Sequence, residues 1–160
     1  MSYPEKLQKI ITLFEGLSDE DKRETLVSYA NTSVNHRPKV DEKFDLEDIR
    51  KDAECTDTVG IYLKVDADRR VTFRVVLGMQ VQTLTKAMVS ILCKGLNGAT
   101  VDEVLNVPSD FVPKIVGAQL IRARSQSVYY VLTRIKSAIK VYTVRQRQAA
   151  LEADEKKSSA

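Results

Sequence analysis

Apolar residues recur along this chain with two different periods, one typical of helices and one typical of strands. From Pro4 to Leu17 they return every three or four positions, which predicts an amphipathic helix. A second short helix is predicted to follow, with Ser18 as its N-cap and acidic residues in its first turn. The apolar positions of these two helices are Leu7, Ile10, Ile11, Phe14, Leu26, Val27 and Tyr29.

The middle of the chain changes to the period-two pattern of strands. The stretch from Asn31 to Asp57 is polar and predicts a long connecting segment, in which DLEDI is expected to form at most one helical turn. Beyond it, alternate positions are apolar from Val59 to Val65 and again from Val71 to Leu77, on either side of the polar turn DADRR. Two such runs predict a β-hairpin that packs one face against helices.

The rest of the chain returns to helical spacing. The stretch from Gln82 to Leu96 is apolar around most of its circumference, which predicts a largely buried helix. Thr100 and Glu103 form a T-x-x-E capping box for a short helix, and a further short helix is predicted after Ser109. A long closing helix is expected to begin at Ser125. Its predicted apolar face is Val128, Val131, Leu132, Ile135, Ile139 and Tyr142, and Arg134, Lys136, Lys140, Arg145 and Arg147 are assigned mainly to other faces.

The order of the elements predicts the α+β class, because the strands are grouped and the helices are segregated from them. We expect two N-terminal helices, a small antiparallel sheet and C-terminal helices packed on one face. A chain of 160 residues suits one domain, which we expect to span residues 1–148. Residues 149–160 carry both charge signs and no large apolar residue after Leu151, so a disordered tail is predicted there.

Composition and charge exclude several classes of function. The net charge of +3 is too small to indicate nucleic acid or an acidic membrane surface as a partner. No apolar run reaches the roughly 18 residues of a membrane span, and the start MSYPEKLQKI lacks the pattern of a signal peptide. We therefore expect a cytoplasmic protein. The motifs of serine hydrolases, zinc peptidases and P-loop proteins are absent from the sequence.

Two cysteines and one histidine limit the candidate chemistry. Cys55 and Cys93 are too few for a disulfide framework and too distant for a four-ligand zinc site, so no metal is expected, and His36 stands alone in a polar segment. Cys93 lies in the apolar helix and is typical of a core residue. Cys55 lies among charged residues where the polar segment meets a strand. Reactive thiols are often partly exposed, so Cys55 is the candidate nucleophile, and an unreactive thiol is the alternative.

The charges next to Cys55 leave its reactivity open. Glu54 and Asp57 would disfavour the thiolate, whereas Arg50 and Lys51 would favour it. A thiol of ordinary acidity still suits a sulfur carrier, because the carrier must attack a persulfide on its partner and later release the sulfur again.

Three stretches of the chain resemble the SufE family of sulfur acceptors. ECTDTVGIYLKVD is similar to that family's G-C-x-S-x-V-W segment and first strand, and LTKAMVSILCKGLNGATVDEVLNVPSDF is similar to its central helix and the short helix that follows. LIRARSQSVYYVLTRIKSAI is similar to its closing helix. The resemblance extends from about Tyr3 to Tyr142 and implies a SufE/IscU-like fold for the domain.

The resemblance also implies a function. Cys55 would receive sulfur from the persulfide of a pyridoxal-phosphate-dependent cysteine desulfurase and pass it to a scaffold protein that assembles Fe–S clusters. Removal of that sulfur would stimulate the desulfurase. The resemblance implies no cofactor on this chain, which would be a transfer partner and activator rather than a stand-alone enzyme. We expect Cys55 to be shielded in the free protein and exposed in the complex.

Four further residues take their expected roles from the same resemblance. Arg124 matches the arginine before the family's closing helix and would orient the cysteine loop or stabilise its anion; the alternative is a surface arginine near a helix start. Glu54, Thr56 and Asp57 flank the cysteine and are expected to contact the partner.

Departures from the family pattern bear on which partner is recognised. Glu54 stands where glycine is common, Asp57 replaces the usual serine, and Gly60 stands where tryptophan is frequent. They leave open a non-catalytic interaction domain of the same fold. A metal or cluster scaffold is the other alternative, for which two distant cysteines are a poor ligand set. A stand-alone thiol enzyme would need a base, and His36 is the single candidate.

Overall fold

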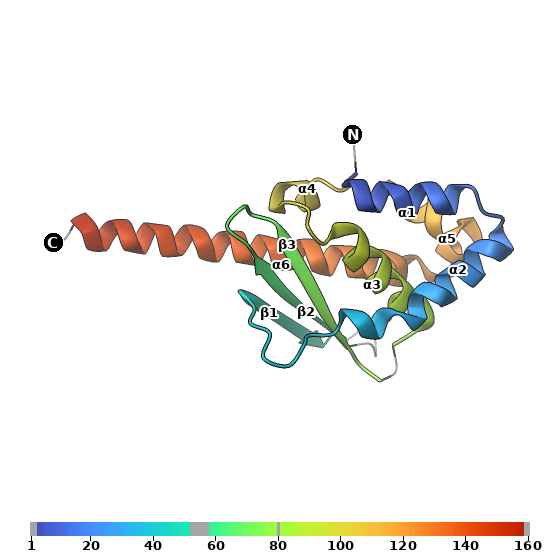
Figure 1. Cartoon of the computed structure of the whole chain (residues 1–160), viewed down its shortest axis with the longest axis horizontal. Coiled ribbons are helices and arrows are strands. Elements are labelled where there is room, and N and C mark those ends of the chain that lie inside the picture. The colour runs from blue at the N-terminus through green and yellow to red at the C-terminus, as the bar shows by residue number, and fades with distance from the viewer. Residues whose placement is uncertain (1–2, 52–57, 80, 159–160) are drawn as a thin grey trace.

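Helices from both ends of the chain pack beside a small three-stranded sheet in the computed structural model (Figure 1). The structure describes residues 3–51, 58–79 and 81–158, with the backbone alone at 50–51, 58, 118–128 and 158. The predicted α+β class is confirmed. The elements are α1 (Glu5–Glu15), α2 (Asp19–Asn31), η1 (Ser33–His36), β1 (Leu46–Lys51), β2 (Thr58–Val65), β3 (Val71–Leu77), α3 (Thr83–Leu96), α4 (Val101–Leu105), η2 (Ser109–Phe111), α5 (Val112–Val116) and α6 (Ala118–Ser158).

Local sequence signals begin several of these elements as predicted. The hydroxyl of Ser18 accepts a hydrogen bond from the backbone N–H of Asp21, which caps α2. At α4 the side chain of Thr100 accepts from the N–H of Glu103, while the Glu103 carboxylate accepts from the N–H of Thr100. The predicted hairpin is β2 and β3, which pair antiparallel from Val59–Leu77 to Val65–Val71.

The sheet contains a strand that the sequence analysis missed. The stretch Leu46–Lys51 was expected to be loop or a helical turn, but it forms β1, which pairs antiparallel with β2. Leu46 lies opposite Leu63 and is buried, so one apolar position anchors the strand to the core. The next residue on the same face is the charged Asp48, so the strand lacks the alternation of apolar and polar residues from which it could have been predicted.

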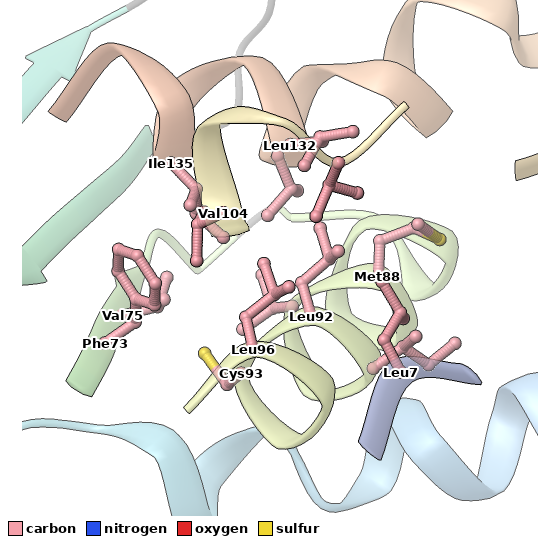
Figure 2. Packing of buried hydrophobic residues seen from close by; sticks show 14 of the residues in the cluster. Leu7, Phe73, Val75, Met88, Leu92, Cys93, Leu96, Val104, Leu132 and Ile135 are labelled. Atoms are coloured by element: carbon pink, nitrogen blue, oxygen red, sulfur yellow. The ribbon is translucent and has the colours of Figure 1, made fainter. Parts of the chain in front are cut away.

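The two faces of the sheet have different environments. Its inner face packs on α3 and α6, and Figure 2 shows Phe73 and Val75 of the sheet close to Leu96 of α3 and Ile135 of α6. The outer face carries Tyr62, whose ring packs edge-on against Phe44 of the segment before β1. The sheet therefore has one face in the core and one partly open face.

The last helix begins earlier and ends later than predicted. It starts at Ala118, directly after Gly117. The φ of +88° at Gly117 favours glycine and interrupts the helical conformation between α5 and α6. The predicted start at Ser125 is wrong, because α6 begins at Ala118. In place of the disordered tail expected at 149–160, the structure continues α6 to Ser158. Alanine, leucine, glutamate and lysine, all strong helix formers, make up most of residues 149–158. None of the helices in the described ranges is long and apolar enough to cross a membrane.

Candidate functional site

The predicted site is centred on a segment at one end of the sheet. Cys55, Glu54, Thr56 and Asp57 lie outside the described residues, and for Arg124 only the backbone, within α6, is described. The residues on either side of the segment are placed: β1 ends at Lys51, β2 begins at Thr58, and these two residues are partners in the sheet. The chain that carries Cys55 therefore joins two neighbouring antiparallel strands.

A buried arginine fixes the strands near this end. Nη1 of Arg134 donates to the carbonyl oxygen of Val59 at 2.8 Å and to the hydroxyl of Tyr130 at 3.2 Å. Nη2 donates to the carbonyl oxygen of Asp48 at 2.9 Å and lies 3.6 Å from a carboxylate oxygen of the same residue. One guanidinium thus bonds β1 and β2 together from the side of α6.

The burial of Arg134 corrects its assignment to a face of the closing helix other than the apolar one. The residue is 4% exposed, and its Nε is buried without a hydrogen-bond partner among the residues that the structure describes. The sequence did contain a signal, because Arg134 is three residues after Val131 and four before Ala138, both in the core. Removal of one partner from a buried ion pair is costly, about 3–5 kcal/mol, so this contact is a structural support for the strand ends.

An exposed apolar surface lies on the other face of the same strands. Ile49, Gly60 and Val76 are partners across the three strands and form what we call the apolar row. Ile49 is 59% exposed and Val76 is 39% exposed. A Cβ atom on Gly60 would lie 3.4 Å from Cγ1 of Ile49 and 3.8 Å from Cβ of Val76, so both side chains cover the glycine. Met79, just beyond β3, is fully exposed.

This apolar row was not predicted from the sequence, although Gly60 was noted as a departure from the family pattern. Scattered single apolar residues on a surface need no explanation, but neighbouring ones indicate a contact surface. The row lies two residues along each strand from the paired ends Lys51 and Thr58. A partner that covers it would therefore lie next to the paired strand ends Lys51 and Thr58.

The second cysteine has no access to solvent. Cys93 lies on α3 among core side chains, with Leu92 and Leu96 on the same helix, and its exposed fraction is 0% (Figure 2). Burial raises the pKa of its thiol to about 12, although the charge of Arg74 opposes the shift. The thiol is therefore protonated at neutral pH, and the prediction that Cys93 is a core residue is confirmed.

A carboxylate in the segment before β1 forms the other polar cluster on the outer face of the sheet. Glu42 accepts from Nζ of Lys64 at 2.6 Å and from Nε of Arg74 at 3.3 Å, and it also accepts from the N–H of Lys39. Burial alone would raise the pKa of Glu42, but these hydrogen bonds and the charge of Arg74 lower it to about 2. The cluster ties the segment to β2 and β3. Within the described part of the chain, no group of three or more histidine, cysteine or acidic side chains could hold a metal ion.

Comparison with known proteins agrees with the architecture. Residues 8–139 match the family model described as the SufE, Fe–S metabolism associated domain. No curated protein matches the chain. A hypothetical protein from Thermus thermophilus has a similar solved structure, with a TM-score of 0.66 and 20% identity over 89% of this chain and 99% of that one.

A second similar structure is the N-terminal part of a nitrogen-fixing NifU-like protein from Brucella abortus. Its TM-score is 0.57 at 19% identity, and the match covers 77% of this chain and 96% of that one. At these identities the two solved structures establish the fold alone.

Proposed function

The chain belongs to the SufE family of Fe–S metabolism associated domains, and from this premise we propose that it accepts sulfur on Cys55 and delivers it for Fe–S cluster assembly. The observation that carries the proposal is the family match over residues 8–139, a range that includes Cys55 and the strands on either side of it. Family membership links the chain to Fe–S metabolism. The thiol, the sulfur donor and the sulfur acceptor are our proposal.

The choice of Cys55 is supported by elimination. The chain has two cysteines, and Cys93 is fully buried with its thiol held in the protonated form. Nucleophilic attack on sulfur needs an accessible thiolate, so Cys93 is unsuited to it. Cys55 is the remaining thiol, and its segment joins strand ends that Arg134 fixes on one face and that the apolar row borders on the other.

The transfer step is a thiol exchange on sulfur. The Cys55 thiolate attacks the terminal sulfur of a persulfide on the partner, a new S–S bond forms on Cys55, and the partner's S–S bond breaks to release its thiolate. The proton of the partner's persulfide stays with the transferred sulfur or exchanges with water. No external oxidant or reductant is required, because one persulfide replaces another.

The proposed donor is a cysteine desulfurase, which would hold the pyridoxal phosphate itself. Removal of its persulfide sulfur frees its thiolate for another turnover, so the acceptor would stimulate the enzyme. The proposed recipient is a scaffold that assembles Fe–S clusters. A reducing compartment such as the cytoplasm would keep Cys55 available as a thiol.

The residues near the segment divide into two proposed roles. The apolar row would contact the desulfurase, together with Glu54, Thr56 and Asp57, and this contact would draw Cys55 towards the donor. Arg124 would orient the segment or stabilise the persulfide anion. Arg134 acts as a positioning residue, because it holds the strands from which the segment departs.

Intact-protein mass spectrometry tests the proposal. The chain is incubated with a cysteine desulfurase, pyridoxal phosphate and cysteine, and the wild type is compared with Cys55→Ser and Cys93→Ala. We expect a gain of one sulfur atom on the wild type and on Cys93→Ala, and none on Cys55→Ser. A sulfur-free wild type that still binds the desulfurase would instead support a non-catalytic interaction domain.

A further inference from the structure

A pocket lined by residues with hydroxyl, amide, imidazole and ammonium groups opens between α2, η1 and α3. Its volume is about 370 Å³, which is large enough for a small molecule. Tyr29 of α2 forms one wall, the segment from Thr32 to His36 forms another, and Ser90 and Lys94 of α3 complete it. The helices α2 and α3 lie side by side in Figure 1, so the pocket is built on packed elements rather than on one loop.

The described charges that act on this pocket, those of Lys94 and Arg74, are both positive. Burial first, and then the positive charges of Arg74 on β3 and Lys94 on α3, hold the pKa of His36 below its ordinary value. The carboxylate of Glu42 is engaged by Arg74 and Lys64 and does not line the pocket. None of the lining residues within the described ranges is acidic, so no described carboxylate in the pocket would balance a cationic or ammonium group.

Hydrogen-bond donors of several kinds surround the same space. The Thr32 hydroxyl donates to the carbonyl oxygen of Tyr29 at 2.8 Å and lies 3.3 Å from the hydroxyl of Ser90, a residue that is 1% exposed. Burial raises the pKa of Tyr29, which keeps its hydroxyl protonated. Asn35 adds an amide, and Lys94 is exposed at the rim.

The aromatic wall is not open for stacking. Phe14 stacks on the ring of Tyr29 with the centroids 5.9 Å apart, and Nζ of Lys94 lies 5.7 Å from the centre of that ring. A flat aromatic ligand would therefore have to displace Lys94. A compact anion that accepts hydrogen bonds in several directions fits the available groups better.

We propose that this pocket binds a small oxyanion of the phosphate class, either free or as the monoester of a small molecule, between Lys94, the imidazole of His36 and the Thr32–Ser90 hydroxyls. Lys94 supplies the fixed charge, and His36 gains a proton when the anion is bound. The proposal does not depend on the sulfur transfer proposed above, because Cys55 is not among the residues that it uses.

Nuclear magnetic resonance of His36 tests the site directly, because the chain has a single histidine and its ring signal needs no assignment. The ring signal is titrated with pH in the absence and presence of inorganic phosphate, and separately of glycerol phosphate, at constant ionic strength. We expect a saturable rise of the His36 pKa with both anions. By linkage, protonation of His36 strengthens anion binding as the pH falls through that pKa, whereas protonation of the phosphate dianion in the same range opposes this effect. Tighter binding of glycerol phosphate would assign the site to a monoester.

Two variants separate a built site from general attraction to a chain of net charge +3. Lys94→Gln is expected to weaken phosphate binding about tenfold, the size of one charge-assisted contact. Lys86→Gln removes the same charge from the same helix outside the pocket and is expected to leave binding unchanged. An unchanged His36 pKa in the wild type at high phosphate, or equal losses in the two variants, would overturn the proposal.

Discussion

The two cysteines belong to different parts of the molecule, one to the core helix α3 and the other to the segment between two strands of the sheet. Cys93 is packed into α3 with no exposed surface, where burial keeps its thiol protonated. Cys55 belongs to the segment that joins β1 to β2, at strand ends that a buried arginine supports on the inner face and an exposed apolar row borders on the outer face. A cysteine side chain is thus an unreactive core residue at position 93 and, in our proposal, the sulfur acceptor at position 55.

The largest effect on stability is expected from the support beneath the strand ends. Arg134→Ala removes an ion pair with Asp48 and two bonds to strand carbonyls, and we expect the free energy of unfolding to fall by about 3–5 kcal/mol. Arg145→Ala, on the exposed part of the same helix, is the matched control and should change it by less than about 0.5 kcal/mol. Equal free energies of unfolding for the two variants, measured by chemical denaturation, would contradict the supporting role of Arg134.

A second substitution asks whether Cys93 is only part of the core. Cys93→Ser puts a hydroxyl in a fully buried apolar site, which we expect to lower the free energy of unfolding by about 1–3 kcal/mol. Sulfur uptake measured by mass spectrometry should be unchanged in the folded variant. Loss of uptake without loss of structure would mean that the contrast between the two thiols is wrong.

A third substitution tests whether the apolar row, which borders the segment of Cys55, contacts the desulfurase. Ile49→Glu places a charge on the 59% exposed position of the row and is expected to weaken binding to the desulfurase about tenfold, with little change in stability. Val144→Glu makes the same change at a 52% exposed position on α6, far from the row along the chain, and serves as the control. Affinities that are equal for both variants in a binding titration would exclude the row as the docking surface.

The smallest effect at neutral pH is expected at Glu42. Because its folded pKa is lowered to about 2 from an ordinary value of 4.5, the carboxylate contributes stability above pH 4.5, and this contribution is lost as the pH falls from 4.5 towards 2. Glu42→Gln should lower stability modestly at pH 7 and flatten the acid side of the stability curve. Denaturation curves at several pH values measure both effects; an acid limb as steep in the variant as in the wild type would contradict this assignment.

Local patterns predicted the parts of the fold that are stabilised locally. The period-two runs predicted β2 and β3, and the caps at Ser18 and Thr100 are formed by residues three positions apart. The strand β1 was missed because its inward position at Asp48 is charged, and its partner Arg134 lies 86 residues away in the sequence. A local stretch of sequence cannot show that these two residues contact each other.

The candidate site was predicted in the same uneven way. The sequence distinguished the buried Cys93 from Cys55, since the apolar neighbours of Cys93 are visible on its own helix. The apolar row depends on the register of three strands, one of which was not predicted. The C-terminal part of α6, by contrast, could have been predicted from the helix propensities of its residues alone. The mixed charges of residues 149–160 led instead to the prediction of a disordered tail.

The most direct test of the central claim uses the native chain without any substitution. After incubation with a cysteine desulfurase and cysteine, the protein is alkylated and digested, and the extra sulfur is located by tandem mass spectrometry of the two cysteine-containing peptides. Our account predicts the alkylated persulfide on the Cys55 peptide and a Cys93 peptide without added sulfur. A persulfide on Cys93, or its absence from both peptides when the desulfurase is bound and active, would contradict it.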